Sequence, residues 1–273
     1  MSANIRLITG IPRSGTTQCC KLLNHRVDVV ALHEPITMSK SYTKTEALDS
    51  IVEQIAQFDR AIEQGLPFAH GVKGGLITDN YVGLNFKNGL RQVVAKRGDV
   101  QLPARDKNSY ALIIKQNALF TALMPELALR FPFICIVRNP VDVLLSWLTV
   151  DLPVNRGHIP AGERFDNRLK KALLDPDCLK RQVIIYQWFI RSFLNSGFPI
   201  VRYEDIVSSN GAILEQSFGW QVTERLALSS QEREFDKSTL LTLEKAKTKL
   251  LGLDCGDLYK KADIKKAMQV QGL

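Results

Sequence analysis

Short apolar runs alternate with helix-like patterns along most of the chain. Five such runs cover residues 5–9, 27–32, 111–115, 133–137 and 199–203. Each run is short and largely apolar, which is typical of a strand buried on both faces of a parallel sheet. Because helical patterns separate the runs, we expect a five-stranded parallel sheet covered by helices on both faces, a three-layer α/β/α fold.

The helical patterns differ in strength. The clearest one repeats apolar residues at steps of three and four, at Leu48, Ile51, Ile55, Phe58 and Ile62, and so marks one face of an amphipathic helix. Further helices are expected over 16–24, 119–130, 141–150, 179–194, 212–218, 240–250 and 258–268. Two other stretches, 65–110 and 151–176, are rich in Gly, Asn, Lys or Pro and predict long irregular segments that form the wall of a binding site.

The composition is that of an ordinary globular protein with excess positive charge. With 273 residues, of which 45% are hydrophobic, a single domain over 1–273 is expected. The net charge of +8 favours anionic partners, although a solvated basic surface explains it equally well. Five cysteines without a CxxC pair, together with no long apolar run and no room for a leader before the first strand, predict a cytoplasmic location. We expect neither a nucleic-acid partner nor membrane insertion.

A glycine-rich loop follows the first apolar run. Residues 10–17 have the spacing of a phosphate-binding P-loop, G-x-x-x-x-G-K-[ST], except that Thr16 replaces the lysine. Glycines allow the tight turn, backbone N–H groups point at an anion, and the helix N-terminus adds a favourable dipole. Thr16 and Thr17 add hydroxyl donors, and Arg13 supplies the positive charge. The loop therefore predicts a site for a phosphorylated nucleotide in a fold like that of P-loop nucleoside triphosphatases (NTPases).

Two features of phosphoryl-transferring P-loop enzymes are missing, the loop lysine and the aspartate that helps to hold Mg²⁺. Those enzymes hold the ion through the loop and an aspartate at the end of another strand. Here the later strands end in Lys115-Gln-Asn and Arg138-Asn-Pro, without such an aspartate. This pattern argues against kinases and nucleotide hydrolases, and we expect no metal.

A second phosphate-binding pattern starts at the end of the fourth run. Arg138 lies just past that strand, and Pro140 occupies the first turn of the next helix. Ser146 follows Arg138 by eight residues, about two helical turns. An arginine and a hydroxyl can share one phosphate, although the segment alone is explained equally well by a surface arginine and a helical serine.

Three segments together resemble sulfotransferases that use 3′-phosphoadenosine 5′-phosphosulfate (PAPS). Residues 12–17 are similar to the family's 5′-phosphosulfate loop, Pro-[Lys/Arg]-Ser-Gly-[Thr/Ser]-[Thr/Ser]. Residues 138–146 are similar to its 3′-phosphate motif, Arg-[Asn/Asp]-Pro-x-Asp-x-x-x-Ser. Residues 201–206, Val-Arg-Tyr-Glu-Asp-Ile, are similar to a strand end of the family, in which Tyr203 matches a tyrosine near the adenine. The resemblance covers about residues 5–220. It implies that the donor is bound by Pro12, Arg13, Ser14, Gly15, Thr16, Thr17, Arg138, Ser146 and Tyr203.

The same resemblance implies the reaction. It is the transfer of a sulfuryl group from PAPS to the hydroxyl of a small-molecule or glycan acceptor, with PAP as the product and no metal. Arg13 is expected to neutralise charge at the transferred group. Two alternatives stay open: a nucleotide or small-molecule kinase with a degenerate P-loop, and a nucleotide-binding module without catalysis.

The general base is expected at the end of the second strand. Residues 24–35 resemble the carbohydrate-sulfotransferase pattern Asn-x-x-x-Asp-Val-x-x-Leu-x-Glu-Pro, in which Glu34 matches the glutamate. Open α/β sheets bind ligands at such strand ends. Glu34 can instead be a helix cap or a hydrogen-bond acceptor. His33 is the rival base, since histidine titrates near neutral pH, although alternation places it on the opposite strand face.

The third run ends close to another motif of the family. Cytosolic small-molecule sulfotransferases carry their base in a Lys-[Ser/Thr]-His arrangement. Here the matching residues are Lys115-Gln-Asn, so Asn117 stands in the place of the histidine and cannot accept a proton. Lys115 is left as an expected electrostatic contact near the sulfate.

Overall fold

The computed structural model describes residues 4–73, 76–77, 82–223 and 235–272. Within these ranges the centre of the molecule is a five-stranded sheet with the order β10-β9-β1-β8-β2, and all of its pairings are parallel. The strands are β1 Ile5–Gly10, β2 Val29–His33, β8 Ala111–Lys115, β9 Phe133–Val137 and β10 Ile200–Arg202. The five predicted runs are therefore confirmed, with ends that differ by two residues at most. Since β1 is central, the loop after it opens in the middle of the sheet's carboxyl edge.

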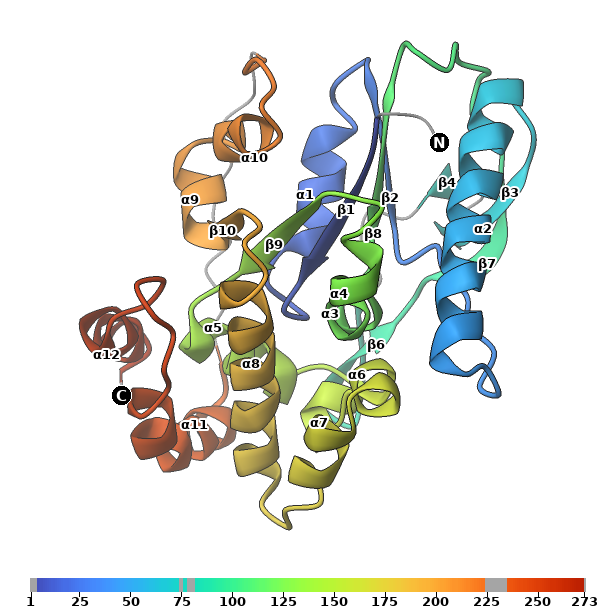
Figure 1. The fold of residues 1–273 in the computed structure, drawn as a ribbon. Helices are drawn as coiled ribbons and strands as arrows, with labels where there is room; N and C mark the ends of the chain where they lie inside the picture. Colours follow the sequence, from blue (N-terminus) through green and yellow to red (C-terminus); the bar gives the residue numbers. More distant parts are fainter. Residues whose placement is uncertain (1–3, 74–75, 78–81, 224–234, 273) are drawn as a thin grey trace.

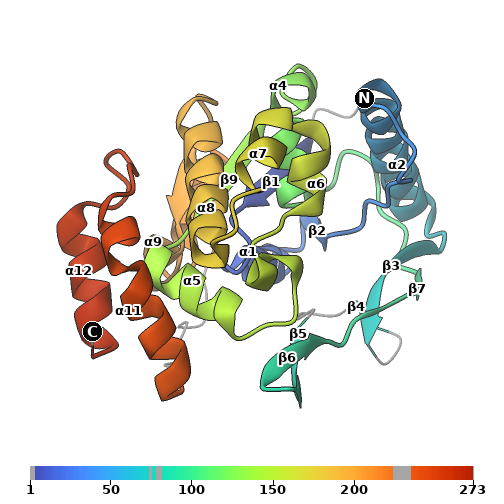
Figure 2. The same cartoon turned by 90° about the horizontal axis from the view of Figure 1, so that it is seen from below.

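Helices cover both faces of the sheet, as the alternating pattern predicts (Figures 1 and 2). Successive residues of β1 show why: Leu7 belongs to one buried cluster and Ile8 to the other, because side chains alternate along a strand. The smaller cluster joins the sheet to α1 Thr16–Leu23, α9 Tyr203–Ser208 and α10 Ala212–Ser217. The larger cluster joins the other face to α2 Lys44–Gln64, α3 Ala118–Ala122, α4 Met124–Leu127, α5 Pro140–Leu148 and α8 Cys178–Leu194.

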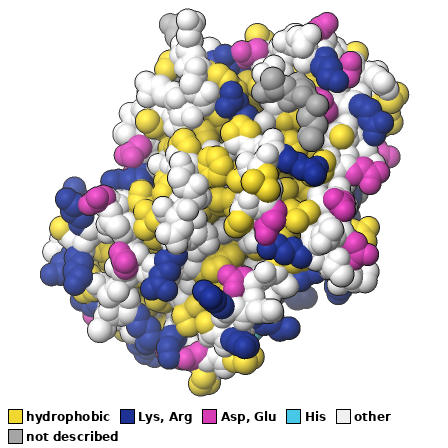
Figure 3. Space-filling model, viewed as in Figure 1, with side chains coloured by type: hydrophobic (Ala, Val, Ile, Leu, Met, Phe, Trp, Pro, Cys, Tyr) yellow, Lys and Arg dark blue, Asp and Glu magenta, His cyan; other side chains and the backbone are white. Residues whose placement is uncertain are grey.

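Two C-terminal helices, α11 Lys237–Leu251 and α12 Lys261–Val270, pack against α5. They lie at the side of the molecule opposite α2 (Figures 1 and 2). Together they hold seven lysines and two acidic residues. Four of the lysines and a glutamate are on α11, and three lysines and an aspartate are on α12. Lysine and arginine side chains gather over this part of the surface in Figure 3. Much of the net positive charge thus lies on the solvated surface of the C-terminal helices.

The amphipathic helix α2 is longer than its apolar repeat. It starts at a capping box, in which Thr43 and Glu46 satisfy each other's backbone N–H groups, and it ends before Gly65 in the left-handed conformation. By contrast, the prediction of a single helix over 119–130 is wrong. The chain forms α3 and then α4, because Pro125 lacks an N–H group and fits only the first turn of a new helix.

The prediction of an irregular segment over 65–110 is also wrong. It contains the antiparallel strands β3 Phe68–Lys73, β4 Leu76–Ile77 and β7 Lys96–Val100, and the hairpin of β5 Val82–Lys87 with β6 Leu90–Val93. The hairpin turns at Asn88 and Gly89, which have φ values of 51° and 75°. This Asn-Gly pair is the sequence signal of a two-residue hairpin turn.

Short helices replace the irregular segment expected over 151–176. They are η1 Pro153–Arg156, α6 Pro160–Phe165 and α7 Asn167–Ala172. Pro153 and Pro160 start helices here, since a proline at the first helical position loses no hydrogen bond. Similarly, Tyr203 is the first residue of α9 and not the last of a strand. No helix in the described ranges combines the length and the apolar content needed to cross a membrane.

Candidate active site

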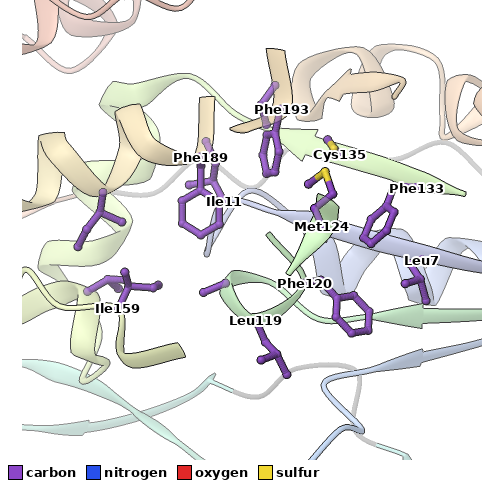
Figure 4. Close-up of a cluster of buried hydrophobic side chains, with 14 of the residues drawn as sticks. Leu7, Ile11, Leu119, Phe120, Met124, Phe133, Cys135, Ile159, Phe189 and Phe193 are labelled. Atoms are coloured by element: carbon purple, nitrogen blue, oxygen red, sulfur yellow. The ribbon is translucent and has the colours of Figure 1, made fainter. Parts of the chain in front are cut away.

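The loop between β1 and α1 is held from two neighbouring elements. Ile11 is buried in the apolar cluster drawn in Figure 4. Ser14 is buried as well, and its Oγ donates to the carbonyl of Ile136 on β9 at 3.2 Å. Trp147 on α5 donates from Nε1 to the carbonyl of Pro12 at 2.8 Å. The loop is therefore fixed before any ligand binds, which is a property of preorganised phosphate sites.

Two residues of the site have unusual backbone conformations. Among the described residues other than glycine, φ is positive at four positions, and two of them are asparagines, which tolerate the left-handed region. The other two are Arg13, at 73°, and Glu34, at 53°. Such positions cost about 1–3 kcal/mol each and gather at functional sites. Both residues are ones for which the sequence predicts a catalytic role.

The two predicted phosphate motifs meet in space. Arg13 donates from Nε to the Oγ of Ser146 at 3.2 Å, although 133 residues separate them. Since Arg13 belongs to the loop and Ser146 to the motif that starts at Arg138, a single ligand can contact both.

Tyr203 connects the same two motifs. The guanidinium carbon of Arg138 lies 4.8 Å from the centre of the Tyr203 ring, and Arg138 also pairs with Asp142 at 3.3 Å. The other contact of this ring is with the loop, because a Cβ built on Gly15 would lie 2.3 Å from the ring atoms Cδ2 and Cε2. Gly15 has φ of 82° and is the N-cap of α1. Only glycine satisfies both the conformation and the close approach.

Two tyrosines and Glu204 hold the Arg138 segment. Tyr186 on α8 donates from Oη to the carbonyl of Arg138 at 2.8 Å. Glu204 accepts from the backbone N–H of Asn139 at 2.9 Å and from the Oη of Tyr259 at 2.7 Å. Burial raises the pKa of the Tyr259 hydroxyl far above its usual value, so that it stays a donor. Sequence reasoning missed this support, since no periodicity links Tyr259 to a residue 55 positions earlier.

Glu34 and Lys115 form an ion pair at the carboxyl edge of the sheet. Lys115 Nζ lies 2.7 Å from Glu34 Oε1, and 3% of the lysine side chain and 29% of the glutamate side chain are exposed. The backbone N–H of Glu34 donates to the carbonyl of Lys115 at 2.7 Å, which continues the pairing of β2 with β8 by one residue. The buried ammonium thus holds a carboxylate that solvent and ligands can reach.

His33 packs against a second histidine. It is buried, and its ring meets that of His70 edge-on, with centroids 5.1 Å apart. Burial is the main cause that lowers the pKa of His70, so this histidine stays neutral in the fold. His33 is thus shielded from solvent, whereas the Glu34 side chain is partly exposed.

A cavity of about 210 Å³ lies between the loop and the 151–176 segment. It is lined by Pro12, Glu34, Gln116, Asn117, Ala118, Leu119, Leu152, Pro153, Val154, Ile159, Pro160 and Ala161. The wall predicted from 151–176 is therefore present, whereas no described residue of 65–110 belongs to this lining. Because Pro12 and Glu34 share the cavity, a molecule inside it contacts both the loop and the carboxylate.

The described ranges contain no group of three or more His, Cys, Asp or Glu side chains placed to hold a metal ion. Three cations, Arg13, Arg138 and Lys115, lie instead at different strand ends or loops of the sheet. Positive charges gathered in this way favour an anionic ligand.

Comparisons with known proteins fit this geometry. Among solved structures, the chain is similar to a sulfotransferase from Alicyclobacillus acidocaldarius, with a TM-score of 0.44 and 14% identity over 97% of this chain and 95% of that one. A search of curated proteins finds no match. The family model described as the sulfotransferase domain matches residues 6–209, well over half of the chain. The chain belongs to the sulfotransferase domain family.

Proposed function

We propose that this protein transfers a sulfuryl group from PAPS to the hydroxyl of a small-molecule or glycan acceptor. The observation that carries the proposal is the hydrogen bond from Arg13 to Ser146, which joins the predicted 5′-phosphosulfate loop to the predicted 3′-phosphate motif. A nucleotide with phosphate groups at both its 5′ and 3′ positions matches such a divided site. The single domain over 1–273 and the cytoplasmic location remain predictions.

The residues present fit this donor. No side chain caps the N-terminus of α1, so its first N–H groups are available to the 5′-phosphosulfate beside Arg13. A side chain at Gly15 would fill the space that the Tyr203 ring occupies. Arg138 is one quarter exposed, and its guanidinium can exchange Asp142 for a 3′-phosphate shared with Ser146. Tyr203 supplies an aromatic face for the adenine.

The transfer step follows from the placement of Glu34. The acceptor hydroxyl loses its proton to the Glu34 carboxylate while its oxygen forms a bond to sulfur. The bond between sulfur and the oxygen of the 5′-phosphate breaks, and its electron pair stays on that phosphate. Arg13 and the loop amides stabilise the charge that develops there. Lys115 holds Glu34 in place and keeps a positive charge near the sulfate.

An assay with labelled PAPS in the presence of EDTA tests the proposal. We expect label to move to a hydroxyl acceptor without Mg²⁺, and Glu34→Gln to lower kcat by about 10²–10⁴-fold while PAP binds as before. Glu126→Gln is the matched control, because it breaks a glutamate–lysine pair with Lys44 on the exposed surface. Full turnover by Glu34→Gln would reject Glu34 as the base. Phosphate transfer from Mg²⁺-ATP without sulfate transfer would favour a kinase instead.

A further inference from the structure

The cavity beside Glu34 is mainly apolar. Nine of its twelve lining residues have apolar side chains: Pro12, Ala118, Leu119, Leu152, Pro153, Val154, Ile159, Pro160 and Ala161. The start of α3 forms one wall, and η1 with α6 forms the other. A hydroxyl placed against such walls loses its water and gains no partner, which disfavours a molecule that carries hydroxyls on every side.

The volume sets the size of what fits. At about 30 Å³ for each water molecule in the liquid, 210 Å³ corresponds to roughly seven waters. A six-membered ring with one or two substituents is of this order. An oligosaccharide is much larger, so only one end of it could enter.

Two polar groups break the apolar lining next to Glu34. Gln116 Oε1 and Asn117 Oδ1 are buried, and neither has a hydrogen-bond partner in the part of the chain that the structure describes. Buried polar atoms in folded proteins are nearly always hydrogen-bonded, so two neighbouring exceptions that line one cavity indicate a ligand that donates to them. An amide oxygen accepts a hydrogen bond but takes no proton, so these groups bind a donor and leave the base role to Glu34.

The backbone around these amides is fixed. The N–H of Gln116 donates to the carbonyl of Ile8 at 3.0 Å. The carbonyl of Asn117 accepts from Thr9 Oγ1 at 2.8 Å and from Thr121 Oγ1 at 3.2 Å. The amide side chains therefore extend from a rigid backbone, which does not need ordering when a ligand binds.

The opposite wall is tied down as well. Arg164 on α6 donates to the backbone carbonyls of Ser39 and Tyr42, in the segment that follows Glu34. Gln182 on α8 donates from Nε2 to the carbonyl of Val154 at 2.9 Å. The cavity thus has a set shape and can select an acceptor by size and by the placement of its polar groups.

We infer that the acceptor is a compact, largely apolar alcohol that carries a second hydrogen-bond donor beside the reacting hydroxyl. The reacting hydroxyl faces Glu34, the second donor is bound by Gln116 and Asn117, and the apolar remainder fills the space toward Ile159. This inference rests on the proposed function. It favours a small alcohol over a carbohydrate, and it assigns Gln116 and Asn117 as residues that determine specificity.

Three alcohols on one carbon ring test the inference. They are cyclohexanol, cis-cyclohexane-1,2-diol and myo-inositol, which has a hydroxyl on every ring carbon. With labelled PAPS, we expect kcat/KM to be highest for the diol, about tenfold lower for cyclohexanol and lowest for myo-inositol. In Gln116→Ala and Asn117→Ala, the ratio between diol and cyclohexanol should fall toward one. Calorimetry of the same alcohols with PAP-loaded protein gives the same comparison without turnover.

The outcomes separate this inference from the proposed function. Affinity for PAP and the unfolding temperature show whether each variant folds. If one variant does not fold, the other alone decides the test. A myo-inositol rate equal to or above that of the diol overturns the inference, as does an unchanged ratio in the folded variants. Binding of PAP without transfer to any ring alcohol overturns the acceptor class and leaves the donor site standing. If PAP does not bind, the proposed function fails and the inference fails with it.

Discussion

A methyl group on Gly15 probes the contact between the phosphate loop and Tyr203. In Gly15→Ala the new Cβ would lie 2.3 Å from two atoms of the ring, about 1 Å closer than ordinary van der Waals contact. The ring must move, and its stacking on Arg138, worth about 0.5–2 kcal/mol, is lost or weakened. The left-handed conformation, with φ of 82°, adds about 1–2 kcal/mol of strain for any residue with a Cβ.

Gly197→Ala separates the strain from the displacement of the ring. Gly197 has φ of 72°, and a Cβ there meets nothing within 4 Å. Gly197→Ala should lose about 1–2 kcal/mol of unfolding free energy, and Gly15→Ala should lose about 0.5–2 kcal/mol more because its ring stacking is weakened as well. Only Gly15→Ala should also weaken PAP binding, by about 10-fold, because it moves both Tyr203 and Arg138.

Calorimetric titration with PAP and urea unfolding of the two variants measure these effects. Equal PAP affinity in Gly15→Ala and Gly197→Ala, with both proteins folded, would refute the assignment of Tyr203 to the donor site. A loss of stability confined to Gly15→Ala would show that the backbone strain has been placed wrongly.

Other predictions concern the support of the site and its pH dependence. Tyr259→Phe removes the donor to Glu204 and should cost about 1–2 kcal/mol of unfolding free energy and weaken PAP binding several-fold. Unchanged PAP affinity would show that the bond from Tyr259 to Glu204 does not support the Arg138 segment. Burial lowers the pKa of His70, so below pH ~6.5 the unfolded chain binds a proton that the folded chain does not. Stability should therefore fall as the pH drops below ~6.5, by at most about 1.4 kcal/mol per pH unit, and His70→Gln should flatten this slope in urea titrations between pH 5 and 7. An equal slope in the variant would exclude His70 as its source.

The central sheet was predictable because its signals are local. Each buried strand is a short apolar run, and parallel pairing brings every strand end to the same edge. The sequence therefore predicts that Gly15 and Arg138 lie at one site, although it gives no distance between them. The Asn88-Gly89 turn was equally local, but the polar residues of 65–110 obscured the alternation of half-exposed strands around it.

The supports of the site were not predictable, since they depend on contacts between distant parts of the chain. Tyr259 lies just before α12, beyond the residues 6–209 that match the family, yet it holds Glu204. No pattern in the sequence indicates that His70 packs against His33. The ion pair of Glu34 with Lys115 depends on the pairing of β2 with β8, two strands that are far apart in the chain.

Binding of PAP and 5′-AMP in EDTA tests the divided donor site most directly, because the two nucleotides differ only in the 3′-phosphate. An arginine–phosphate contact contributes about 1.5–3 kcal/mol, so the wild-type protein should bind PAP roughly 10–100-fold more tightly than 5′-AMP. In Arg138→Ala this preference should nearly disappear, while the affinity for 5′-AMP changes little. Equal affinity of the wild-type protein for the two nucleotides, or a preference that survives in Arg138→Ala, would contradict the account.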